Sequence, residues 1–181
     1  AGDEALVSQL IDQATVDWRG DDDQTALHNA AWFGHTPVVT RLLDAGWSLE
    51  ARDQDGVTPL RGASGRGHLE TVKCLLLRGA DMDTQSDNNW TPLHRASLGG
   101  YTEVIRTLLH CGANQHIRSS GGDTAEDKAG NYETMKVFMG FSTKGEQSKN
   151  VLLQQAIYEK NYDVAIILIF RGAILAGSDT F

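Results

Sequence analysis

The sequence predicts an all-α solenoid built from repeated helix-turn-helix units, and three observations support that fold class. Similar stretches begin at Thr25 (TALHNAAWFGH), Thr58 (TPLRGASGRGH) and Thr91 (TPLHRASLGGY), each 33 residues after the one before. Every copy has a threonine suited to capping a helix at its start and glycines suited to ending helices. Apolar residues recur at helical spacing and end in a Leu-Leu pair. One such unit cannot bury its apolar face alone, so the units are expected to stack.

The first element expected is an N-terminal capping half-repeat over residues 1–19. Within it, residues 4–17 look like the second half of a repeat, in which Leu6, Leu10 and Ile11 form the apolar face. The whole chain, residues 1–181, is expected to form a single domain because the repeat signals run through nearly all of it.

Three regular repeats are expected over residues 20–123. In each, a turn rich in Asp, Asn or Gly precedes the threonine. Pro59 and Pro92 then occupy the first helical position, where no amide hydrogen is needed. The first helix carries a small residue that lets neighbours approach closely, and the equivalent positions are Ala30, Ala63 and Ala96. The second helix carries its apolar residues on one face.

A shortened, irregular repeat is expected over residues 124–150, and a last repeat over residues 151–181. Thr124 begins the fourth unit on schedule, but the stretch between Ala129 and Glu133 is three residues shorter than in its neighbour. Local distortion is expected there, and residues 140–150 read as a polar, loose finger. Val151 opens the fifth unit. The chain ends soon after Gly172, where another finger would begin, which is compatible with a piece of a longer protein.

These features resemble the ankyrin repeat family. The period of 33 residues, the Thr-Pro-Leu-His start at Thr91, the glycines and the Leu-Leu pairs all agree with its motif. The resemblance implies L-shaped units, each with a short β-hairpin finger and two antiparallel helices. About five such repeats, with the N-terminal half-repeat, would stack into a curved solenoid with a concave groove.

Composition narrows the classes of partner. The net charge of −8 repels phosphate, so neither nucleic acid nor a membrane surface is expected as a partner. No apolar run reaches the roughly 18 residues of a membrane helix. Two cysteines are too few for a disulfide-stapled scaffold and favour a reducing compartment. The expected location is the cytoplasm, with the nucleus as an alternative.

Three consecutive aspartates at 21–23 precede the first helix and correspond to fingertip positions in the later repeats. Turn formation explains acids at such positions without any catalytic role. The alternative is an acidic docking patch, for which the candidate residues are Asp22, Asp23 and Asp55.

The histidines suggest structure rather than metal binding. His28 and His94 occupy the Thr-Pro-Leu-His position, where the resemblance implies a hydrogen-bonding link between hairpins. Zinc needs about four converging ligands, and the local cluster of His110, Cys111 and His116 has no second Cys/His pair nearby. No metal and no cofactor are therefore expected.

Two repeats depart from that histidine, since Arg61 and Asp127 replace it. Structural drift is the favoured interpretation, with function as the alternative. The sequence contains neither a nucleophile elbow nor a phosphate-binding loop, so the protein is not expected to be an enzyme. A remote alternative places a catalytic pocket at the irregular units, with Asp127, Glu133 and residues 140–150.

Large aromatic and cationic residues mark the expected binding surface. Trp and Arg often anchor protein interfaces, and the resemblance places several of them on the concave face. The candidates are Trp32, Phe33, Arg66, Trp90, Arg95 and Leu98. For Trp32 and Phe33 the alternative is packing against the N-terminal unit as core.

The sequence therefore predicts a monomeric, non-catalytic protein-protein interaction module. It would bind a partner protein or peptide, basic or mixed in charge, on its concave face. The alternative is a regulatory or scaffolding domain of a larger enzyme, channel or receptor. An uncovered terminal face around Ile166 and Ile169 would favour association.

Overall fold

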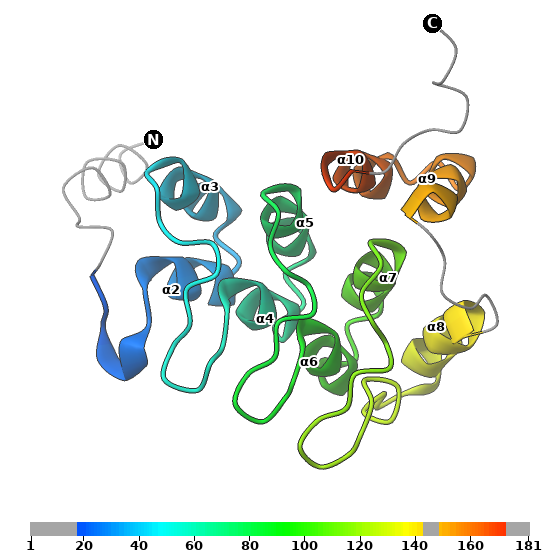
Figure 1. Ribbon diagram of the computed structural model, residues 1–181, viewed down its shortest axis with the longest axis horizontal. Coiled ribbons are helices and arrows are strands. Elements are labelled where there is room, and N and C mark those ends of the chain that lie inside the picture. Colours follow the sequence, from blue (N-terminus) through cyan, green and yellow to red (C-terminus); the bar gives the residue numbers. More distant parts are fainter. Residues whose placement is uncertain (1–17, 143–148, 173–181) are drawn as a thin grey trace, which may run out of the picture.

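Three helix pairs of the same design follow one another along the chain. The computed structural model describes residues 18–142 and 149–172, and it confirms the all-α repeat solenoid. A short 3-10 helix, η1 (Asp21–Asp23), precedes the first pair. The pairs are α2 (Ala26–Trp32) with α3 (Thr36–Asp44), α4 (Pro59–Ser64) with α5 (Leu69–Leu77), and α6 (Pro92–Gly99) with α7 (Thr102–His110). In Figure 1 the first helices form one layer and the second helices another.

The start of each first helix is fixed by a threonine cap. The side chains of Thr25, Thr58 and Thr91 each accept a hydrogen bond from the backbone N–H three residues later. This satisfies one of the amide groups that a helix leaves unpaired at its start. Proline at the first position of α4 and α6 costs no hydrogen bond for the same reason. The helix starts expected from the sequence are thus present.

A glycine is required between the two helices of a pair. Gly34 has φ +72°, which side chains other than glycine rarely adopt. A Cβ at this position would also lie 2.5 Å from Nδ1 of His68 in the next repeat. His68 cannot easily move away, because its Nε2 is 3.0 Å from the carbonyl oxygen of Trp32. The glycine therefore serves both the turn and the contact between repeats.

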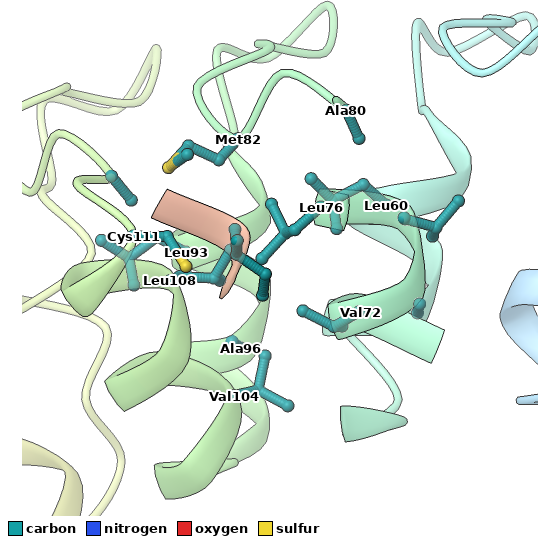
Figure 2. Close-up of a cluster of buried hydrophobic side chains, with 14 of the residues drawn as sticks. Leu60, Val72, Leu76, Ala80, Met82, Leu93, Ala96, Val104, Leu108 and Cys111 are labelled. Carbon is teal, nitrogen blue, oxygen red and sulfur yellow. The ribbon is translucent and has the colours of Figure 1, made fainter. Parts of the chain in front are cut away.

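The core lies between the two helix layers and continues from one repeat to the next (Figure 2). Fully buried leucines from successive units meet there, among them Leu60, Leu76, Leu93 and Leu108. Burying each such side chain stabilises the fold by about 1.5–3 kcal/mol. Trp47 is also buried.

The fingers are tight loops rather than the β-hairpins that the resemblance implied, since no residue of the described ranges lies in a strand. A main-chain hydrogen bond closes each finger, for example from Asp53 N to the Val57 oxygen at 3.1 Å. Neighbouring fingers are also joined: Gln54 N donates to the Asp22 oxygen and Asp87 N to the Asp55 oxygen. Isolated bonds of this kind do not build the continuous ladder that a strand needs.

The fourth unit has a turn at residues 125–128 where its neighbours have a first helix. Its second helix, α8 (Tyr132–Ser142), packs against α7. A stretch three residues shorter leaves too little chain for a complete first helix, which is the local distortion that the sequence indicated.

The last helix pair occupies a position that the repeat pattern did not indicate. Helices α9 (Lys149–Tyr158) and α10 (Tyr162–Phe170) pack together, and α10 lies against α5 (Figure 1). Lys73 of α5 pairs with Asp163 at 2.7 Å, and Arg171 donates to the Ala80 carbonyl oxygen at 2.8 Å. The chain thus returns to the second repeat after the fourth.

Most of the expected N-terminal half-repeat, and the end of the last repeat beyond Gly172, lie outside the described residues. Ile166 and Ile169, the expected terminal apolar face, are 45% and 50% exposed. None of the helices in the described ranges is long and apolar enough to cross a membrane.

Candidate partner-binding surface

The surface formed by α2, α4, α6 and the fingers that flank them is called the inner face below. Trp32 ends α2 and reaches toward the second repeat: a Cβ at Gly62 would lie 3.7 Å from its ring. The Arg66 guanidinium lies 4.0 Å from the centre of the Trp32 ring. Trp32 is half-buried as a result. The ring is therefore packed against the second repeat and only partly exposed, whereas the core alternative expected packing against the N-terminal unit, most of which lies outside the described residues.

A second aromatic ring on this face is also flanked by cations. Trp90, at the base of a finger, is half-buried, and Arg95 and Lys128 lie 5.8 and 5.9 Å from the centre of its ring. Such cation-aromatic contacts stabilise by about 0.5–1 kcal/mol at exposed sites. They hold long arginine side chains in fixed places, where a partner can meet them without a large loss of side-chain entropy.

Two apolar side chains of the predicted set are open to solvent. Phe33 is 63% exposed and stacks against His35, and Leu98 near the end of α6 is 52% exposed. Phe33 is therefore a surface residue in the described structure. Exposed side chains of this size suit contact with a partner.

An open cleft with a volume of about 270 Å³ lies on the inner face and is shared by three repeats. Trp32 comes from the first repeat, Arg61 from α4 and Arg95 from α6. Finger residues of the second repeat complete the lining, among them Asp53 and Asp55. Two arginines therefore share a cleft with two acids.

Arg61 has an unusual electrostatic position. Its Nε atom is buried without a hydrogen-bond partner, and no ion pair within residues 18–142 and 149–172 involves it. Burial, and then the positive charge of Arg95, lowers the pKa of Arg61 to about 10, against the attraction of Asp53 and Asp55. The guanidinium remains charged near neutral pH because that pKa is well above 7.

Equivalent positions in the other repeats are used differently. Nδ1 of His28 accepts from Thr25 N at 3.1 Å, and its Nε2 bonds the Val57 oxygen at 2.9 Å. His94 repeats both contacts with Thr91 and the Asp123 oxygen. These are the links between fingers that the resemblance implied. Burial lowers the pKa of both imidazoles, which favours the neutral form.

Asp127, at the same position in the fourth unit, bonds to the threonine at the start of its own unit, as the histidines do. Its carboxylate accepts from the backbone N–H and the hydroxyl of Thr124, both at 2.8 Å, and these bonds lower its pKa. Asp127 is exposed, and Glu133 pairs with Lys136 at 3.2 Å. Neither provides the buried acid that a catalytic pocket in this unit would need.

The fingertip acids have a clear role in turn formation. Asp22 and Asp23 have φ near +60°, a conformation that Asp and Asn tolerate better than most residues. Gln54 Nε2 donates to Asp22 Oδ1 at 2.9 Å. Arg19 and Arg52 donate to main-chain oxygens of the next finger, so they hold fingers together and form no ion pair with the aspartates in the described structure.

The structure brings some of the predicted residues together and leaves others apart. Trp32, Arg95 and Asp55 line the cleft, and Arg66 covers Trp32. Asp22 and Asp23 lie at a fingertip outside it. In the sequence, Arg61 is visible only as a departure from the repeat and is not among the predicted site residues. That departure could have indicated a functional residue, because a side chain that does not make the contact repeated in the other units is available for a different one.

Two family models match the chain. A model of the ankyrin repeat matches residues 22–54, and a model of three ankyrin repeat copies matches residues 42–119. Together they cover residues 22–119, which is more than half of the 181 residues. No curated protein matches the chain.

Proposed function

Because this chain belongs to the ankyrin repeat family, we propose that it is a non-catalytic module that binds a partner protein or peptide on its inner face. Ankyrin repeats are in general protein-protein interaction modules, which supports the class of function. The residues on the inner face support the location.

The main support for binding at the inner face is the set of aromatic and cationic side chains on it. Trp32 and Trp90 are each covered by an arginine, and Phe33 and Leu98 are more than half exposed. Trp and Arg supply much of the binding energy in protein interfaces. A solenoid with a continuous core presents them in a fixed arrangement, so little conformational entropy is lost on binding.

The test compares inner-face variants with a matched variant elsewhere. F33A/L98A removes two exposed apolar side chains from the inner face, and L77A removes one, 39% exposed, from the end of α5. All are surface changes, so circular dichroism and thermal unfolding should remain close to those of the wild type. Immobilised wild type, F33A/L98A and L77A are then used to capture proteins from the same lysate, with quantitative mass spectrometry.

Proteins captured by the wild type and L77A, and lost with F33A/L98A, would support binding at the inner face. Capture that F33A/L98A leaves unchanged would refute this location. A further variant, Y158A/F170A, then tests whether the interface lies on the last helix pair, where these side chains are 88% and 75% exposed.

A further inference from the structure

We propose that the cleft at Arg61 binds the carboxylate of an acidic side chain, Asp or Glu, in an extended segment of the partner protein. This rests on the proposed function and specifies the chemistry that the inner face recognises. The acid would lie between the guanidinium groups of Arg61 and Arg95, with its neighbours along Trp32.

The positive charges in the cleft have no direct ion-pair partner among the described residues, although Asp53 and Asp55 line the same cleft. Arg61 and Arg95 both line it, and Arg61 Nε is buried without a hydrogen-bond partner. Neither arginine takes part in an ion pair within the described parts of the chain. A carboxylate suits the terminal nitrogens of these guanidinium groups, because its two oxygens can accept parallel hydrogen bonds from them, whereas the buried Nε is out of a ligand's reach.

Arg61 also has no structural task of the kind that its equivalents in the other repeats perform. His28 and His94 close a cap and bond to a carbonyl oxygen of the next finger. The Arg61 side chain makes neither contact; only its backbone N–H reaches Thr58, at 3.4 Å. The side chain lines the cleft instead, so the second repeat gives up a stabilising link and gains a cation.

The acidic residues around the cleft indicate the charge of the rest of the ligand. Asp53 and Asp55 lie on the finger side of the same cleft, and η1 adds three exposed acids at the neighbouring fingertip. These charges repel a dianion such as a phosphate group and attract Lys or Arg. A peptide with one acidic residue and basic neighbours fits both parts of the surface, and it also suits a chain whose net charge is −8.

The experiment uses the full 181-residue chain as bait for a random peptide library displayed with blocked C-termini. Peptides enriched on the wild type over R61H are synthesised, and their dissociation constants are measured by fluorescence anisotropy at low salt. We expect a single Asp or Glu flanked by Lys or Arg. R61H should weaken binding by about tenfold or more, the scale of a hydrogen bond between charged groups. Changing the peptide Glu to Gln should have a similar effect.

The two changes should not add, since each removes the same contact. R61K keeps the positive charge but loses the paired donors of the guanidinium, so it should bind with intermediate affinity. R61Q repeats the test if R61H does not fold. A second library with free C-termini tests the other source of a carboxylate: selection of terminal acids in place of Asp or Glu side chains would overturn the proposal.

Peptides that bind R61H and the wild type with equal affinity would also overturn the proposal, and so would peptides whose affinity is unchanged when Glu is replaced by Gln. A library that yields no peptide enriched on the wild type over R61H would overturn it as well. The proposed function is scored separately with F33A/L98A. Binding lost with F33A/L98A but independent of Arg61 would leave the inner face as the interface and remove only the carboxylate site.

Discussion

The variant R61H places in the second repeat the residue that the first and third repeats carry at the same position. In those repeats the imidazole Nδ1 accepts from the capping threonine N–H, and Nε2 bonds a carbonyl oxygen 29 residues ahead. The equivalent partners of a histidine at position 61 are the N–H of Thr58 and the carbonyl oxygen of Trp90. We expect R61H to form both bonds and to be more stable than the wild type.

The size of the effect follows from the groups involved. Each new hydrogen bond contributes about 0.5–1.5 kcal/mol, and removal of a buried, unpaired Nε relieves a further cost. Loss of the arginine stem and of its attraction to Asp53 and Asp55 works in the other direction. The free energy of unfolding should rise by about 1 kcal/mol, which corresponds to roughly 2–4 °C in Tm for a chain of this size.

Urea unfolding followed by circular dichroism near pH 7.5 measures this difference. The reciprocal variant H94R is the matched control, because it removes both bonds in the third repeat. It should lower the free energy of unfolding by about 1–2 kcal/mol. An R61H midpoint below that of the wild type, with an unchanged slope, would refute the reasoning and show that Arg61 stabilises its own repeat.

Three further predictions follow from the described structure. The free energy of unfolding should fall between about pH 7.5 and about pH 5, because burial holds the pKa of His28 and His94 below 6.5 and the unfolded chain therefore takes up protons first. Urea titrations in which the free energy of unfolding does not change over this pH range would contradict this. Gly46→Ala should cost about 1–2 kcal/mol for its left-handed backbone alone, since its surroundings are open. Gly34→Ala should cost more, because its Cβ also meets His68, and equal midpoints would show that His68 moves aside freely. In thiol labelling of the native protein, the partly exposed Cys74 should react first, whereas burial raises the pKa of Cys111 to about 12 and should protect it until unfolding; equal labelling rates would argue against the packing around Cys111.

Much of the fold could be predicted because its determinants are local or periodic. The threonine caps, the prolines and the glycine turns each act within a few residues, and the sequence displays them directly. Contacts between neighbouring repeats also recur at a fixed separation. The bond from His28 to Val57 spans 29 residues, and so does the bond from His94 to Asp123. A pattern that repeats in the sequence therefore predicts a contact that repeats in space.

The candidate site was predicted less completely. For Phe33 the sequence leaves exposure and core packing open, and its side chain is exposed, as is that of Leu98, which was predicted to face a partner. For Trp32 the sequence favours exposure over core packing, but the side chain is half-buried, because Gly62 and Arg66 of the next repeat cover part of the ring. Arg61 was visible only as an irregularity, and the cleft that it lines requires side chains from three repeats.

The sequence by itself determined the class of fold, the starts of the first helices and the apolar residues that face the core, since these follow from hydrogen bonding and burial within units of 33 residues. Tertiary structure alone decided where the last helix pair lies and which charges share a cleft. The contacts from Lys73 to Asp163 and from Arg171 to Ala80 span 90 and 91 residues and occur once. Such contacts leave no periodic trace in the sequence, because they depend on how complete surfaces fit together after the repeats have formed.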